Sequence, residues 1–369
     1  MIRFRESLAR GICVILGTAL ALVLAEIVAR GVIVCVDNPV GVGDHFKAIH
    51  EPKAARYLYH LKPHSRAVIS AKLLYSINSH GLRSPEIPYA KPPGEQRVLV
   101  LGDSVAFGFG VSDEQTFSRI LQEQLGEGYA VINAGVGGYN TYLEYEFLRA
   151  EGIRYDPDVV ILAVCLNDVA YPLMHFSSHM LKCLGPIPAE AYPALSWVDF
   201  LQARSVLFRW VCEWLNFGSH RIYRKSVSGK RSGPAPSEND AREKKTRRHW
   251  EGDLKKLMDP RSREWSWLRK QILRIRDGVR EREGRLIVVV FPFRYQMQED
   301  AYDGIFQHFS EFFSREGIEG MDLLQAFRRH EEEKGTELFR DTSHLNPEGH
   351  RLTAKLLAEP LLKNAPGVS

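Results

Sequence analysis

The sequence lacks the patterns by which most cofactors and metals are bound. It has no GxGxxG stretch and no Walker-type glycine-rich loop, which argues against a nucleotide or dinucleotide site. Its five cysteines are an odd number without a CxxC pair, so neither a zinc site nor a disulfide framework is indicated. The early histidines show no metal-ligand spacing and are expected to be surface or packing residues: His45, His50, His60, His64 and His80. We therefore expect neither a cofactor nor a metal.

A strong charge of one sign is also missing, since the formal net charge is only +4. Much of the basic excess lies in residues 219–249, which contain Gly, Ser and Pro and have little to bury. We expect this tract to be a mobile insertion. A basic run can bind nucleic acid, but this one has neither interleaved aromatic residues nor a binding fold around it. No nucleic-acid partner is expected, and attraction to anionic lipid or glycan is the alternative.

Long apolar runs are scarce except at the N-terminus, where residues 11–36 are apolar apart from Glu26 and Arg30. About 20 apolar residues span a bilayer as a helix, and two charges four residues apart can pair on one helix face. Three arginines precede the run, and positive residues before such a helix indicate a cytoplasmic N-terminus. We predict that residues 1–36 are a cytoplasmic stub and transmembrane anchor, with the remainder in the periplasm or at the cell surface. A cleaved signal peptide is the main alternative, and a buried soluble helix is another.

Residues 37–96 are predicted to form a β-rich extension and a linker. Short β-like runs occur at residues 57–61, 67–69 and 73–77. Four prolines between residues 85 and 93 mark the linker into the next domain.

From Arg97 onward, apolar runs alternate with helical patterns, which favours a parallel sheet with helices on both faces. Strands are expected at Val98–Leu101, Tyr129–Asn133, Val159–Leu166 and Leu286–Phe291. Helices are expected at Glu114–Leu125, Tyr142–Glu151, Trp250–Glu283 and Asp300–Phe313, then from about Asp322 to Gly335 and from Pro347 to Leu362. We predict a three-layer α/β/α sandwich over residues 97–365, with a long insertion at about 169–250. A disulfide between Cys183 and Cys212 in that insertion is left open.

Polar residues follow the predicted strands where a nucleophilic site needs them. A serine nucleophile needs a base, an acid that orients the base, and donors for the oxyanion. Ser104 follows the first strand, in the crevice where open α/β sheets bind ligands. Gly138 follows the second strand, where the missing side chain lets a backbone N–H approach the reacting atom, and Asn167 follows the third with an amide donor. Asp341 and His344 lie three apart in a turn, so both side chains can face one way.

Each signal also has a plainer interpretation. Ser104 could cap the next helix, Asn167 could belong to a simple turn, and His344 could be a surface histidine. His330 and His350 are rival bases, but neither has an acid three residues ahead on a loop.

The four signals, taken in order, resemble the motifs of the SGNH hydrolases, also called GDSL esterases/lipases. The matching blocks are Gly102-Asp103-Ser104, Asn133 to Gly138, Cys165 to Asp168, and Asp341 to His344. The likeness runs in patches from Arg97 to Leu362 and implies a flavodoxin-like sandwich. It also implies an oxyanion hole made by Gly138, Asn167 and the N–H of Ser104. Val105 replaces the family's leucine and Cys165 replaces a glycine. The stretch Tyr75–Pro85 resembles membrane-anchored bacterial members.

The resemblance implies an esterase in which His344, oriented by Asp341, takes the proton of Ser104 as it attacks an acyl or acetyl ester of a lipid or glycan. An O-acyltransferase that passes the acyl group to a polysaccharide is the first alternative. A catalytically silent glycan-binding protein on the same fold is the second.

Overall fold

The computed structural model describes residues 16–28, 48–53, 57, 59–70, 73–168, 251 and 254–363. The predicted insertion at 169–250, with its basic tract and the Cys183–Cys212 pair, lies outside the described residues. So do most of residues 1–36.

Within the N-terminal segment, residues 16–28 form a helix whose large apolar side chains are exposed, among them Leu16, Leu20 and Ile27. The predicted membrane span extends past both ends of this helix. In the described ranges, no helix is both long enough and apolar enough to cross a membrane.

The centre of the fold is a sheet of five parallel strands in the order β6-β5-β7-β8-β9. The strands are β5 (Gln96–Gly102), β6 (Tyr129–Asn133), β7 (Val159–Cys165), β8 (Arg285–Phe291) and β9 (Glu319–Asp322). The first four are runs of buried apolar residues, as expected for strands covered on both faces. The predicted parallel sheet is therefore confirmed, with β9 added at one edge. That strand was expected only as the lead into a helix, because it is short, partly exposed and contains Gly320.

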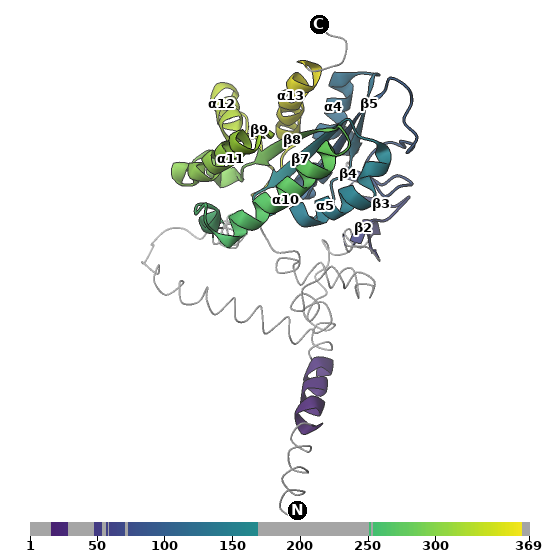
Figure 1. Ribbon diagram of the computed structural model, residues 1–369, viewed down its shortest axis with the longest axis vertical. Helices are drawn as coiled ribbons and strands as arrows, with labels where there is room; N and C mark the ends of the chain where they lie inside the picture. Colours follow the sequence, from purple (N-terminus) through teal and green to yellow (C-terminus); the bar gives the residue numbers. More distant parts are fainter. Residues whose placement is uncertain are drawn as a thin grey trace, which may run out of the picture.

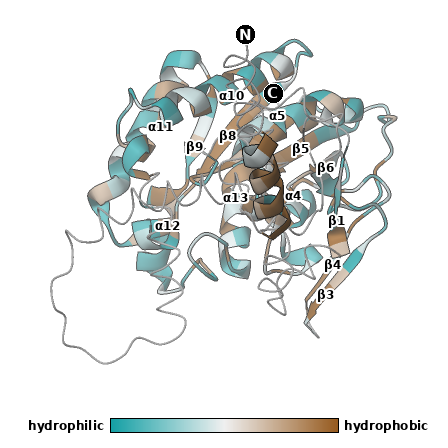
Figure 2. Cartoon of the chain, turned by 90° about the horizontal axis from the view of Figure 1, so that it is seen from below, coloured by the Kyte–Doolittle hydropathy of each residue, from teal (hydrophilic) through white to brown (hydrophobic). Residues whose placement is uncertain are grey.

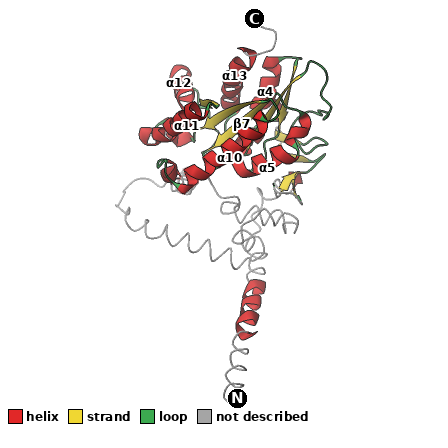
Figure 3. Ribbon diagram, viewed as in Figure 1, coloured by secondary structure: helices red, strands yellow, loops and turns green. Residues whose placement is uncertain are grey.

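Helices cover both faces of this sheet (Figures 1 and 3). On one face α4 (Phe117–Leu125) packs against α13 (Pro347–Lys363), and on the other α5 (Thr141–Ala150) packs against α10 (Arg263–Arg280). Two further helices are α11 (Asp303–Glu316), which packs on β9, and α12 (Leu324–Lys334). Single 3₁₀ turns are η1 (Asp113–Gln115), η2 (Gly152–Tyr155), η4 (Arg294–Met297) and η5 (Asp300–Tyr302). From β5 the chain moves to β6 on one side and then crosses back over β5 to β7 on the other side. Because such crossovers are right-handed, α4 and α5 lie on opposite faces of the sheet.

The single helix predicted over Trp250–Glu283 is wrong. Residues 254–257 are helical, but the chain then turns before α10 begins. Pro260 lies in this turn, where its missing N–H and fixed ring end a helix. Ser262 starts the next one, since its hydroxyl accepts the N–H of Trp265 at 3.1 Å.

The extension forms two small antiparallel pairs; the β-like runs predicted three of the four strands, and β1 was not expected. β1 (His50–Pro52) pairs with β2 (Tyr59–Leu61), and β3 (Arg66–Ser70) pairs with β4 (Leu73–Ser76). Tyr59 is fully buried, and its hydroxyl donates to the Gly137 carbonyl at 2.8 Å. The extension thus joins the apolar core of the sandwich, which Figure 2 shows as brown strands between helices with teal outer faces.

Candidate active site

Ser104 lies where β5 ends, at the point where the strand order reverses. It is the first residue of the short helix α3 (Ser104–Phe107), and Asp103 before it caps the helix by accepting the N–H of Val105 at 2.8 Å. The cap is therefore Asp103, which leaves the hydroxyl of Ser104 available. This carboxyl end of a switch-point strand is where ligands bind in open α/β sheets.

His344 connects Ser104 to Asp341. Its Nε2 lies 2.9 Å from the Ser104 Oγ, and its Nδ1 lies 2.9 Å from both Asp341 carboxylate oxygens. An ionised carboxylate only accepts, so Nδ1 carries the proton and Nε2 of the neutral ring is left to accept from the serine. The structure thus brings three predicted residues into one hydrogen-bonded chain across 240 residues of sequence.

The turn that holds Asp341 and His344 is fixed by its own backbone. The Asp341 Oδ1 accepts the N–H groups of Ser343 at 3.1 Å and His344 at 2.9 Å. Burial raises the pKa of Asp341, but the hydrogen bonds and charge of His344 outweigh it and bring the pKa to about 2. Asn346 caps α13 as predicted, accepting from the N–H groups of Glu348 and Gly349.

Asn167 is joined to the same centre through Asp103. The Asn167 Nδ2 donates to the Asp103 Oδ2 at 3.1 Å, and the Ser104 Oγ lies 3.3 Å from that oxygen. One amide hydrogen is therefore used to orient Asn167, and the second remains for another acceptor. Asp103 is fully buried, which raises its pKa, while the bonds from Val105 and Asn167 lower it.

The turn before Asn167 accommodates the unusual Cys165. Asp168 closes it twice, with its N–H on the Cys165 carbonyl at 2.9 Å and its Oδ2 accepting the Cys165 N–H at 2.8 Å. The thiol is free and buried, and burial raises its pKa.

Gly138 lies in the loop after β6 with φ of 80°, a left-handed conformation that glycine adopts without strain.

The rival histidines have other partners. His350 is 1% exposed, and its Nδ1 accepts the Phe117 N–H at 3.2 Å. Burial lowers its pKa to about 3. The Nε2 of His330 lies 3.3 Å from the Glu348 carboxylate. Neither contacts Ser104.

Two features of the site were not predicted. The ring of Phe109 packs against His344 with centroids 4.7 Å apart, and the Arg340 Nη1 donates to the Gly110 carbonyl at 2.8 Å. Contacts of this kind depend on the folded loops and leave no signal in the sequence.

A group of buried acids near Asp103 was not predicted either. Glu144 on α5 is 1% exposed, and neither carboxylate oxygen has a hydrogen-bond partner among the described residues. Burial and the nearby charge of Asp103 raise its pKa well above the usual value. Asp168 is fully buried, and burial and Glu144 raise its pKa in the same way.

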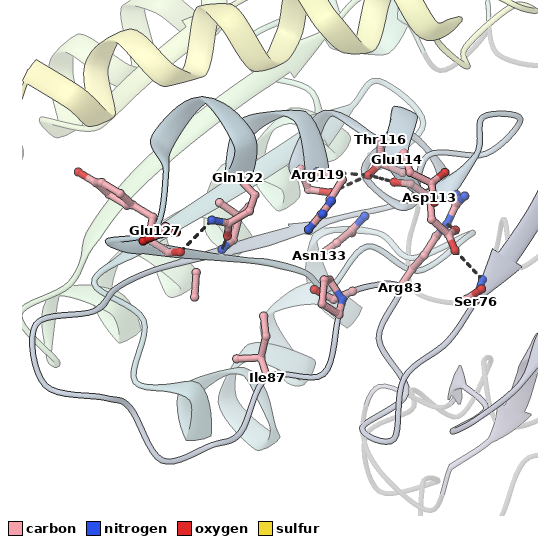
Figure 4. A pocket seen from close by; sticks show the side chains of 16 residues that line it. Ser76, Arg83, Ile87, Asp113, Glu114, Thr116, Arg119, Gln122, Glu127 and Asn133 are labelled. Carbon is pink, nitrogen blue, oxygen red and sulfur yellow. Dashed lines mark hydrogen bonds and ion pairs between the residues drawn. The ribbon is translucent and has the colours of Figure 1, made fainter.

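A cavity in the described ranges has a volume of about 690 Å³ and lies at the outer edge of β6 (Figure 4). Arg83, Asp113, Thr116 and Asn133 are in its wall, whereas the triad residues are not. The described part of the chain has no group of three His, Cys, Asp or Glu residues placed to hold a metal ion.

Residues 100–184 match the model of the GDSL-like Lipase/Acylhydrolase family. No curated protein matches the chain significantly.

Several solved structures are similar to the chain. An acetyl xylan esterase, AlAXEase, is 16% identical, with 72% of this chain and 99% of that one covered and a TM-score of 0.41. TesA is 13% identical, with 72% and 99% covered and a TM-score of 0.39. A lipolytic protein of the G-D-S-L family from Veillonella parvula is 11% identical, with 73% and 99% covered and a TM-score of 0.41. The match over residues 100–184 is to a GDSL-like lipase/acylhydrolase domain, and the chain is a hydrolase that acts on esters.

Proposed function

We propose that the protein is a serine esterase that removes acyl or acetyl groups from a lipid or glycan through an acyl-enzyme. The observation that carries the proposal is the continuous hydrogen-bond chain from Ser104 through His344 to Asp341. His344 takes the proton of Ser104 as its Oγ attacks the ester carbonyl, and returns it to the leaving alcohol. Asp341 holds the ring in the required tautomer and stabilises its charged form.

The charge that develops on the carbonyl oxygen needs preorganised donors. We assign this role to the backbone N–H groups of Ser104 and Gly138 and to the amide nitrogen of Asn167. These groups follow β5, β6 and β7, which are neighbours in the sheet. Water, deprotonated by His344, then attacks the acyl-enzyme and releases the acid and Ser104.

A fluorophosphonate probe tests the nucleophile on the full 369-residue chain. We expect an adduct on Ser104 by peptide mapping, lost in His344→Ala and retained in His330→Ala. His330 is a matched control because it also lies beside a carboxylate, at 3.3 Å from Glu348, but away from Ser104. Ester cleavage that survives in Ser104→Ala would refute the proposal. Acetyl release from an acetylated glycan without a sugar acceptor separates hydrolysis from acyl transfer.

We further propose that the N-terminal segment anchors the protein, with its N-terminus in the cytoplasm and the catalytic domain outside. The exposed apolar side chains of helix 16–28 support this, because such a surface is stable in lipid. Deleting residues 1–36 should move the protein from the alkali-washed membrane fraction to the soluble fraction. A truncated chain that stays in the membrane contradicts the anchor, and a reporter fused after the domain that is active only in the cytoplasm contradicts the orientation.

A further inference from the structure

We propose that Arg83, which precedes the sandwich domain, is a positioning residue that holds the turn after Ser104 in its reactive geometry. The inference rests on the proposed role of Ser104. It gives a function to the Tyr75–Pro85 stretch, which the triad and oxyanion hole do not use.

The Arg83 guanidinium is bound on every side by the loop that follows α3. Its Nη1 donates to the carbonyls of Phe107 at 3.0 Å and Gly108 at 2.7 Å, and its Nη2 donates to that of Val111 at 2.7 Å. The Nε pairs with the Asp113 carboxylate at 2.7 Å. Arg83 is only 4% exposed, so these bonds are shielded from water.

The helix that begins with Ser104 needs such support. α3 has four residues, and a helix this short is not stable by itself. The carbonyls at a helix C-terminus have no partner within the helix, and Arg83 supplies the missing donors to Phe107 and Gly108. Gly108 donates back to the Ser104 carbonyl at 3.1 Å. A shift of the turn at Gly108 therefore moves the backbone of Ser104.

A second anchor comes from the same stretch. The Tyr75 hydroxyl accepts the Gly110 N–H at 2.8 Å, and its ring lies 4.2 Å from the Arg83 guanidinium carbon. The Ser76 N–H donates to the second oxygen of Asp113 at 3.1 Å, as the dashed line in Figure 4 shows. The loop that presents Phe109 to His344 is thus held at several points by residues outside the sandwich.

Arg97 provides a matched control. It too is fully buried, with donors on three carbonyls, those of Tyr89, Ala90 and Tyr155, and its Nε on the Glu95 carboxylate. It lies near the start of β5, whereas Ser104 follows the end of that strand, so the two are about 20 Å apart at 3.3 Å per residue. Losing the hydrogen bonds of Arg97 should lower stability in the same way as losing those of Arg83, without moving Ser104.

The experiment compares Arg83→Lys and Arg97→Lys in the full chain, using the hydrolysis of p-nitrophenyl acetate and the thermal midpoint. Lysine keeps the charge but not the fork of donors. We expect both variants to melt earlier. Only Arg83→Lys should lose kcat, by about 10²-fold, since a misplacement of about 1 Å at a reacting group has that effect. Its KM should stay near the wild-type value, and Arg97→Lys should keep the wild-type kcat.

Two further variants cover the case in which Arg83→Lys does not fold. Tyr75→Phe removes only the acceptor of the Gly110 N–H and should lower kcat with KM unchanged. Arg83→Ala should regain part of its kcat in low concentrations of guanidinium. The positioning role is overturned if Arg83→Lys and Arg97→Lys lose kcat equally, if the loss appears in KM, or if Tyr75→Phe keeps full kcat. Wild-type protein whose Ser104 takes no fluorophosphonate would instead overturn the proposed nucleophile itself, and the inference with it.

Discussion

Replacing Asp103 with asparagine is expected to disable the oxyanion donor. It leaves the His344 bonds to Ser104 and Asp341 in place and changes only the oxygen that lies 3.3 Å from the Ser104 Oγ. In the present structure one Asp103 oxygen accepts the Val105 N–H and the other accepts the Asn167 Nδ2 at 3.1 Å. In Asp103→Asn the first oxygen is kept, while the second becomes an NH₂ group that faces another NH₂ group. The Asn167 amide then turns over so that its oxygen accepts, and its nitrogen leaves the position in which we expect it to meet the oxyanion.

The size of the effect follows from the loss of one oxyanion donor, which costs about 10²–10³ in kcat, or about 3–4 kcal/mol. The fold should be kept, because asparagine caps a helix as well as aspartate does and a buried charge is removed. We therefore expect a large fall in kcat with a thermal midpoint no lower than that of the wild type. The assay is steady-state hydrolysis of a chromogenic ester, with the midpoint measured on the same samples.

A double variant makes the reasoning refutable. If Asp103 acts through Asn167, then Asn167→Ala and Asp103→Asn remove the same donor, and combining them should add little to either alone. Losses that multiply in the double variant would show that Asp103 works by another route. A wild-type kcat in Asp103→Asn would refute the orientation of the amide altogether.

The other predictions concern stability. Burial lowers the pKa of His60 and of His350 to about 3, while unfolded histidine titrates near 6.5. Between these pH values the unfolded chain therefore binds more protons than the folded protein. The free energy of unfolding should fall as the pH drops from about 6.5 toward 3, by up to about 1.4 kcal/mol per pH unit for each histidine. His350→Asn, which keeps an acceptor for the Phe117 N–H, should flatten this slope in urea titrations at several pH values, and an unchanged slope would contradict the assignment. Glu144→Gln should raise stability near pH 7 by about 1–3 kcal/mol, because the folded protein must take up a proton on Glu144 that the unfolded chain has released, and glutamine needs none. That gain should vanish below about pH 4.5, where both folded and unfolded states hold the proton. The control is Glu146→Gln on the same helix. Glu146 is also 1% exposed but is paired with Arg149 at 3.1 Å, so this variant should not gain stability. Equal gains in stability from both variants would contradict the argument.

The parts of the fold that the sequence predicts well are those governed by local patterns. The buried strands are continuous apolar runs, so β6 was expected with its observed bounds and β7 within one residue. Asn346 and Pro347 mark the start of α13 by their capping chemistry. β9 has no such run, and its place in the sheet is set by pairing with β8. Pro260 could have indicated the break before α10, but the apolar spacing around it suggested one helix.

The candidate site divides in the same way. Ser104, Asn167 and His344 are each predicted by a polar residue at the end of a strand or before a helix, together with the family motifs. The role of Arg83 was not predicted, because it depends on hydrogen bonds to carbonyls more than 20 positions away along the chain. Only the folded loop brings these carbonyls together. Asp103 was noticed only as part of a motif, although an aspartate before a short helix is a cap signal.

The separation of Ser104 from His344 by 240 residues has a consequence for when the protein becomes active. As the chain leaves the ribosome, β5 and its serine emerge long before the turn that carries the base. We therefore expect the proposed nucleophile to be inactive during synthesis. It should gain its base only once the turn with His344 has folded beside α13, which packs on α4 where the His350 ring accepts the Phe117 N–H. On heating, we expect ester turnover to be lost when α13 leaves α4, because the turn with His344 directly precedes α13. Turnover should then report the loss of this contact separately from the unfolding of the sheet.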